Sequence, residues 1–196
     1  MYKKQMLFQR IVCMAVLVAS ALVFVYSLGL LTDLYDSLYL TIRDPANLEM
    51  TTVQGSRIYY DMQSFNSELT KVGIGLILVS LVLFLMNTHS RRKYYIGNFV
   101  AVALSVVCNV AATVWAVIEI SGYRAKFLQM DFEALKAHAE MWKTLYTEST
   151  FWFDAGYIVF GILMIATVLL VVNLILKLNV MKDEKRLIGS RKEVGA

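Results

Sequence analysis

Polar side chains recur every four residues within one apolar run of the sequence. Ser105, Asn109 and Thr113 would share one face of a helix, beside small side chains at Cys108 and Ala112. Small residues at this spacing let two helix backbones approach closely, and the Asn109 amide can hydrogen-bond across the contact. The same face could instead line a path for a small solute. The pattern therefore predicts helix packing, with a pore lining as the alternative.

Residues typical of catalytic or metal sites do not cluster in the sequence. His89 lies beside the basic cluster 91–93 and His138 lies in the segment 120–153, and Cys13 and Cys108 fall within apolar runs. The chain lacks a phosphate-binding glycine loop, a zinc-ligand spacing and a nucleophile elbow. We therefore expect a noncatalytic protein with no metal and no cofactor.

The elements that must position these residues are long apolar runs. The sequence is 58% hydrophobic and 17% charged, whereas soluble domains carry about a quarter charged residues. Four charge-free runs each approach the ~20 residues that a helix needs to cross a hydrocarbon core of about 30 Å. Backbone amides cannot stay unpaired in lipid, so each run is expected to be helical. The sequence predicts an all-α membrane protein, a four-helix transmembrane bundle with spans at about 11–32, 72–89, 95–119 and 154–177.

The distribution of charge predicts the side of the membrane that each segment occupies. Most of the 19 lysine and arginine residues flank the spans on the side of the two termini. Most of the 15 acidic residues lie in the two other loops, 33–71 and 120–153. By the positive-inside rule, both termini and the tail 178–196 are cytoplasmic, in a cell membrane. Residues 1–196 form a single domain in this layout.

Basic residues on the predicted cytoplasmic side are expected to contact the headgroups of an anionic inner leaflet. The tail that begins at Lys177 belongs to this surface. Its other members are Lys3, Lys4, Arg91, Arg92 and Lys93. This contact accounts for the pI near 9.0 without a nucleic-acid partner.

Ionisable side chains are expected only at the ends of the spans. Coupled carriers usually place such a group near mid-bilayer, and no predicted span has one there. Glu119 comes nearest, but it follows the apolar part of its span and can reach water or Arg124. The sequence therefore does not indicate an ion-coupled transporter.

The first outer loop is predicted to hold an amphipathic helix and a small β-hairpin. Apolar residues recur at helical spacing from Leu31 to Ile42. Farther on, β-favouring tetrapeptides at 51–54 and 57–60 flank the two-residue link Gly55-Ser56, which is typical of a hairpin.

The second outer loop is predicted to form an amphipathic helix capped by Asp131. Glu133, Lys136 and Glu140 alternate in sign on its polar side. The apolar side could dock a partner or pack on the first loop as a cap, and the sequence leaves both open. The candidate docking residues of the two loops are Phe132, Leu135, Trp142, Tyr146, Tyr59 and Tyr60.

Two functions fit this sequence. The leading hypothesis is a noncatalytic accessory or scaffold subunit that binds a partner membrane protein, an extracytoplasmic protein or a second copy of itself. The alternative is an oligomeric channel or facilitator for a small solute, lined by Ser105, Asn109 and Thr113.

Overall fold

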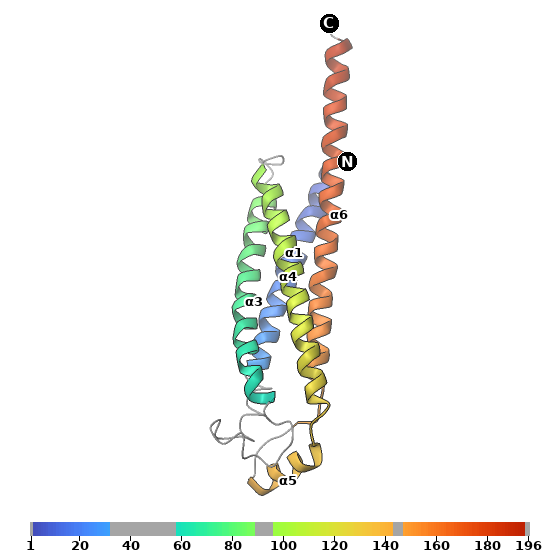
Figure 1. Cartoon of the computed structure of the whole chain (residues 1–196). Coiled ribbons are helices and arrows are strands. Elements are labelled where there is room, and N and C mark those ends of the chain that lie inside the picture. Colours follow the sequence, from blue (N-terminus) through green and yellow to red (C-terminus); the bar gives the residue numbers. More distant parts are fainter. Residues whose placement is uncertain (1, 32–57, 89–95, 143–146, 195–196) are drawn as a thin grey trace.

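The chain folds into a long bundle of helices, shown in Figure 1. The computed structural model describes residues 2–31, 58–88, 96–142 and 147–194. Within these ranges every regular element is helical and no strand occurs. The helices are α1 (Tyr2–Gly29), α3 (Ile58–Thr88), α4 (Ile96–Phe127), α5 (Phe132–Trp142) and α6 (Phe151–Val194).

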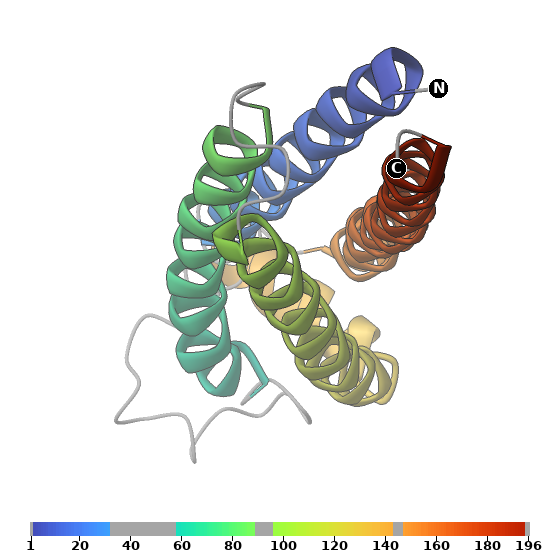
Figure 2. The ribbon, with the colours of Figure 1, turned by 90° about the horizontal axis from the view of Figure 1, so that it is seen from above.

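Each of the four long helices runs antiparallel to its two neighbours around a common core. α1 packs against α3 and α6, and α4 packs against the same two helices, so the bundle closes as a ring. Figure 2 shows this ring from above. Both termini lie at one end, which we call the terminal end, and α5 lies at the opposite end, which we call the cap end (Figure 1).

All four long helices are apolar enough and long enough to cross a membrane, as predicted. The segments that meet both criteria are Lys4–Gly29, Asp61–Thr88, Ile96–Phe127 and Phe151–Glu184. Their outward faces are apolar as well: Ile11, Leu78, Val107 and Ile165 are each more than half exposed. A contiguous apolar exterior of this kind is typical of lipid contact. The chain is therefore a multi-pass membrane protein.

Close approach between helices depends on small residues. A methyl group added at Gly156 on α6 would lie 2.5 Å from the Tyr26 hydroxyl and 2.8 Å from Ile120 Cδ1. One at Gly73 on α3 would lie 3.0 Å from the Cα atom of Phe24 on α1. Neither position has room for a side chain, so these two glycines set the spacing of the helices that cross there.

The prediction of the second hairpin strand is wrong. α3 begins at Ile58, so residues 58–60 are helical, and the helix starts well before the predicted span 72–89. Ile58, Met62 and Phe65 are buried at helical spacing, and this apolar stripe continues into the bundle. Burial of the stripe outweighs the β-preference of the tetrapeptide. The first strand and the Gly55-Ser56 link lie outside the described residues, as does most of the amphipathic segment predicted before them.

The helix predicted in the second outer loop is present as α5. The Ala134 amide donates a hydrogen bond of 3.0 Å to Asp131 Oδ1, which makes Asp131 the N-cap as expected. The Leu135 amide also donates to the Asp131 carbonyl, at 3.0 Å. Glu133, Lys136 and Glu140 are exposed, so the polar face of α5 points away from the bundle.

Candidate functional site

Polar side chains from all four long helices gather at the terminal end of the bundle. We call this group the amide cluster. All its members are buried, none with more than 8% of its surface exposed. They are Gln5 and Gln9 on α1, Asn87 on α3, Asn98 on α4, and Asn173 and Lys177 on α6.

The α1 members of the cluster connect three helices. Gln5 Nε2 donates a hydrogen bond of 3.0 Å to Gln9 Oε1 and one of 3.2 Å to Asn173 Oδ1 on α6. Gln9 Nε2 in turn donates to the backbone carbonyl of Asn87 on α3. Buried amides of this kind stabilise helix contacts because every donor they carry needs a partner in lipid.

The α3 member extends the network to the fourth helix. Asn87 Nδ2 donates to the Leu83 carbonyl at 3.2 Å and to the Asn98 carbonyl on α4 at 3.3 Å. A continuous series of amide contacts therefore joins α6, α1, α3 and α4 at one level of the bundle.

Lys177 is buried at this end of the bundle, which corrects the prediction that it begins a tail at the lipid headgroups. Only 4% of its surface is exposed, and its ammonium lies 4.9 Å from the centroid of the Phe99 ring on α4. It continues the buried stripe of α6 formed by Leu163, Leu170 and Asn173. This spacing aims the lysine into the bundle and not toward headgroups.

The surroundings of Lys177 contain amides and an aromatic ring. Among the described residues no carboxylate pairs with its ammonium. The cation–π contact with Phe99 compensates for part of the hydration energy that the ammonium loses on burial. An uncompensated buried cation costs free energy, which marks it as a candidate functional group. Chemically, the site is a buried, amide-rich contact between helices that carries one cationic side chain, and it is suited to holding the helices together.

A second polar contact lies within the span. Asn109 Nδ2 on α4 donates a hydrogen bond of 2.9 Å to Thr167 Oγ1 on α6, and Thr167 Oγ1 donates to the Leu163 carbonyl at 2.8 Å. Ser105 and Thr113, one turn to either side, are also buried in the bundle. Their hydroxyl oxygens have no hydrogen-bond partner among the described residues. The choice between packing and pore lining at these three positions stays a prediction.

Aromatic rings fill the cap end. The Phe127 ring of α4 lies 5.2 Å from that of Phe132 on α5 and 5.3 Å from that of Phe153 on α6, measured between centroids. Leu135 is 0% exposed, so it packs into the molecule and cannot contact a partner directly in this state. Among the other candidate docking residues, the side chains of Tyr59, Tyr60 and Trp142, and the whole of Tyr146, lie outside the described part.

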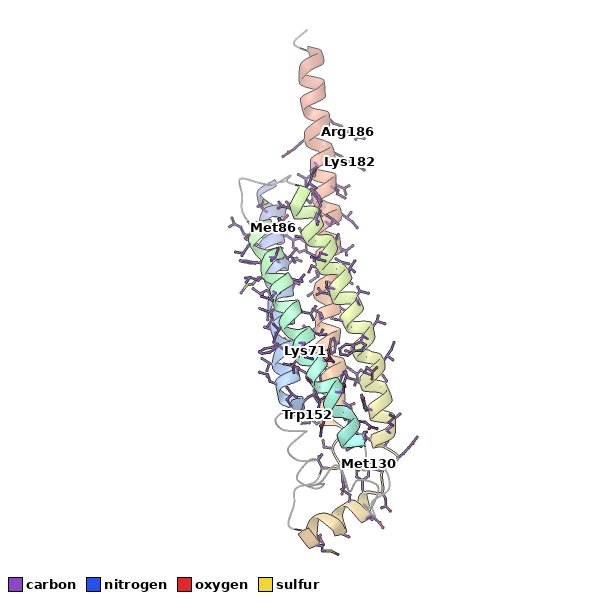
Figure 3. The ribbon with its side chains drawn as sticks, turned by 60° about the vertical axis from the view of Figure 1, so that its left-hand side comes forward. Lys71, Met86, Met130, Trp152, Lys182 and Arg186 are labelled. Carbon is purple, nitrogen blue, oxygen red and sulfur yellow. The ribbon has the colours of Figure 1, made fainter. Side chains whose placement is uncertain are left out.

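Two further polar contacts lie at the cap end, one between α4 and α6 and one between α1 and α6. Arg124 Nε lies 3.3 Å from Asp154 Oδ1, an ion pair by distance without hydrogen-bond geometry. The Tyr26 hydroxyl on α1 donates to the Trp152 carbonyl at 2.9 Å. Figure 3 shows Trp152 at the start of α6 and Met130 in the link to α5. Arg124, which the sequence offered beside water as a contact for Glu119, pairs with Asp154.

Of the basic residues predicted at the headgroups, Lys4 is exposed at the start of α1. The side chain of Lys3 and residues 91–93 lie outside the described part. Within that part, no group of three or more His, Cys, Asp or Glu residues is placed to hold a metal ion.

The amide cluster was not predicted from the sequence. Two spacings in the sequence are consistent with it. Gln5 and Gln9 are four residues apart, as are Asn173 and Lys177, so the members of each pair share a helix face. Comparison of the chain with protein-family models, with curated proteins and with solved structures finds no match. The function must therefore be inferred from the chain's own geometry.

Proposed function

We propose that this multi-pass membrane protein is a noncatalytic accessory or scaffold subunit that binds a partner membrane or extracytoplasmic protein. The observation that carries the proposal is the form of the cap end. There α5 packs its apolar side on the bundle and presents a mixed-charge face outward.

The exposed face of α5 has the properties of a preformed recognition surface. Glu133, Lys136 and Glu140 supply charges of both signs, and Met141 is 75% exposed. Charges of alternating sign favour a complementary partner and disfavour others. An exposed methionine adds an adaptable apolar contact.

α5 is held on the bundle without a partner, which favours binding through its exposed face. Leu135 is buried and Asp131 caps the first turn, so α5 is already ordered before any partner arrives. A preordered surface loses less conformational entropy on binding than a flexible one.

The interior of the bundle supports a structural role over a catalytic one. The amides of Gln5, Gln9, Asn87 and Asn109 all donate hydrogen bonds between or along helices. Polar groups used in this way stabilise the fold and are not free to act on a substrate.

Photo-crosslinking in native membranes tests this function. A photoreactive amino acid at Lys136 or Glu140 should yield an adduct of one defined mass with another protein. The same photoreactive amino acid at Val107, on the lipid-facing side of α4, should give lipid adducts only. A third position, Lys182 on the terminal end, measures the adducts that form by random collision. Adducts that are no more frequent at α5 than at these controls would contradict partner binding at the cap end.

A channel or facilitator is the second candidate, and one observation favours it. Among the described residues the hydroxyls of Ser105 and Thr113, on either side of Asn109, have no hydrogen-bond partner, and unpaired buried hydroxyls are suited to contact water or a polar solute. In liposomes, Asn109→Leu should then abolish solute flux while Val107→Leu leaves it unchanged. Flux that survives Asn109→Leu would remove this lining assignment.

A further inference from the structure

A groove of about 420 Å³ opens between α1 and α6 at the terminal end. Its walls are mainly apolar, with Phe8 from α1 and Leu176 and Val180 from α6. Two of the residues that line it are charged, Lys4 from α1 and Asp183 from α6. Figures 1 and 2 show α1 and α6 as neighbouring helices of the bundle.

The groove lies at the depth of lipid headgroups. The span-capable segments begin at Lys4 in α1 and end at Glu184 in α6, so both charged residues stand at a boundary of the apolar region. A 26-residue helix is about 39 Å long at a rise of ~1.5 Å per residue. That length exceeds a hydrocarbon core of about 30 Å, which places the ends of α1 among headgroups.

The charges of the groove balance. Lys4 and Asp183 are both exposed and form no ion pair with each other. Each is therefore available to a ligand, and together they offer a cation and an anion on opposite walls. A purely anionic headgroup would meet Asp183 unfavourably, whereas a zwitterion can satisfy both residues.

We propose that this groove binds a zwitterionic phospholipid with a primary ammonium headgroup. The phosphate pairs with Lys4, the ammonium donates to the Asp183 carboxylate, and an acyl chain runs along Phe8 and Leu176. A primary ammonium can donate hydrogen bonds to a carboxylate, and a quaternary ammonium cannot, so phosphatidylethanolamine fits better than phosphatidylcholine. This site is at the opposite end from the proposed partner surface and does not depend on it.

Native mass spectrometry of the full chain tests the site. The protein is released from nanodiscs that contain equal amounts of phosphatidylethanolamine, phosphatidylcholine and phosphatidylglycerol, and retained lipids are identified. We expect one retained phosphatidylethanolamine, favoured over each other lipid by about tenfold, the effect of one charge-assisted hydrogen bond. Lys4→Gln and Asp183→Asn should each remove this preference.

Two matched variants separate the groove from general surface charge. Lys182 is exposed on α6 but does not line the groove, so Lys182→Gln should keep the preference. Figure 3 places Lys182 near the point where α6 projects past the other helices. The double exchange Lys4→Asp with Asp183→Lys restores one charge of each sign and should recover binding that Lys4→Asp alone loses.

Several results would overturn the proposal. Retained phosphatidylglycerol that only Lys4→Gln releases would indicate an anion site, and equal retention of the two zwitterions would indicate an apolar crevice. A mass of two chains without lipid would show that a second copy fills the groove. Equal loss with Lys182→Gln would show that the groove is not the determinant. Unchanged unfolding midpoints in all variants establish that loss of lipid is not loss of fold.

Discussion

The side-chain amide of Asn109 on α4 donates a hydrogen bond to the hydroxyl of Thr167 on α6 across 2.9 Å. The two residues are 58 positions apart in sequence, and their contact fixes the register of two membrane-spanning helices. Together with the amide cluster at the terminal end, it places polar contacts between helices at two levels of the bundle.

Removing this contact should cost little stability. Asn109→Leu and Thr167→Val should each lower the free energy of unfolding by about 0.5–2 kcal/mol, because hydrogen bonds between membrane helices are individually modest. The double variant should cost less than the sum of the two. Unfolding in mixed micelles with increasing denaturing detergent measures all three proteins. Strict additivity would show that the two side chains do not interact in solution.

Gly156 should tolerate no side chain. In Gly156→Ala the new methyl meets the Tyr26 hydroxyl and Ile120, so α6 must move away from α1 and α4. We expect a loss of about 1–3 kcal/mol in the free energy of unfolding, as for other overpacked cores. Gly161→Ala is the control, and unfolding in mixed micelles measures both variants. In the described part of the chain, no atom outside the backbone of α6 around Gly161 lies within 4 Å of the added position, so Gly161→Ala should be neutral or slightly stabilising.

If the two alanine variants unfold alike, the close approach at Gly156 is not a determinant of packing. A larger loss of unfolding free energy in Gly161→Ala than in Gly156→Ala would contradict the structure, because it would place the helix contact on the face of α6 that carries Gly161.

The buried position of Lys177 can be measured by chemical modification. An amine-reactive acylating reagent should modify Lys182 on the exposed side of α6 at least about tenfold faster than Lys177, since Lys177 reacts only after local opening. Peptide mass spectrometry of opened native membranes reports both rates in one sample. Denaturing detergent should bring the rates together. Equal rates before denaturation would contradict the burial of Lys177.

The cap of α5 depends on the Asp131 carboxylate. Asp131→Ala should cost about 1 kcal/mol of local helix stability and raise amide exchange at the start of α5 about fivefold. Hydrogen–deuterium exchange followed by mass spectrometry measures this region directly. Asn caps as well as Asp does, so Asp131→Asn should exchange like the natural chain. Fast exchange in both variants would show that charge, and not the cap hydrogen bond, orders α5.

The membrane helices were predictable because lipid imposes one strong requirement on the sequence. A long run without charge, such as 155–176, must form a helix in lipid, whatever the remaining residues are. The cap of α5 was predictable for a similarly local reason: Asp131 stands directly before its amphipathic stretch.

Features that depend on distant residues were missed. Asp61, Glu68 and Lys71 made the start of α3 look like a loop, although Ile58 and Met62 bury its inner side. Lys177 was assigned to the tail because it is the first charged residue after the run 155–176. Its burial becomes visible only once Phe99 of α4 is placed beside it.

The amide cluster shows the same limit. Gln5 and Gln9 lie between Lys4 and Arg10 and look like part of a polar terminus. Their partners, Asn173 and Asn87, are supplied by other helices at sequence separations that no local pattern encodes.

The most direct test of the proposed function is the mass of the intact complex from native membranes. The chain alone has a mass of 22.2 kDa. Gentle extraction at natural abundance, followed by native mass spectrometry, should give a larger species that releases this chain together with a different polypeptide. A species that consists only of the 22.2 kDa chain and lipid would contradict the assignment as a partner-binding subunit.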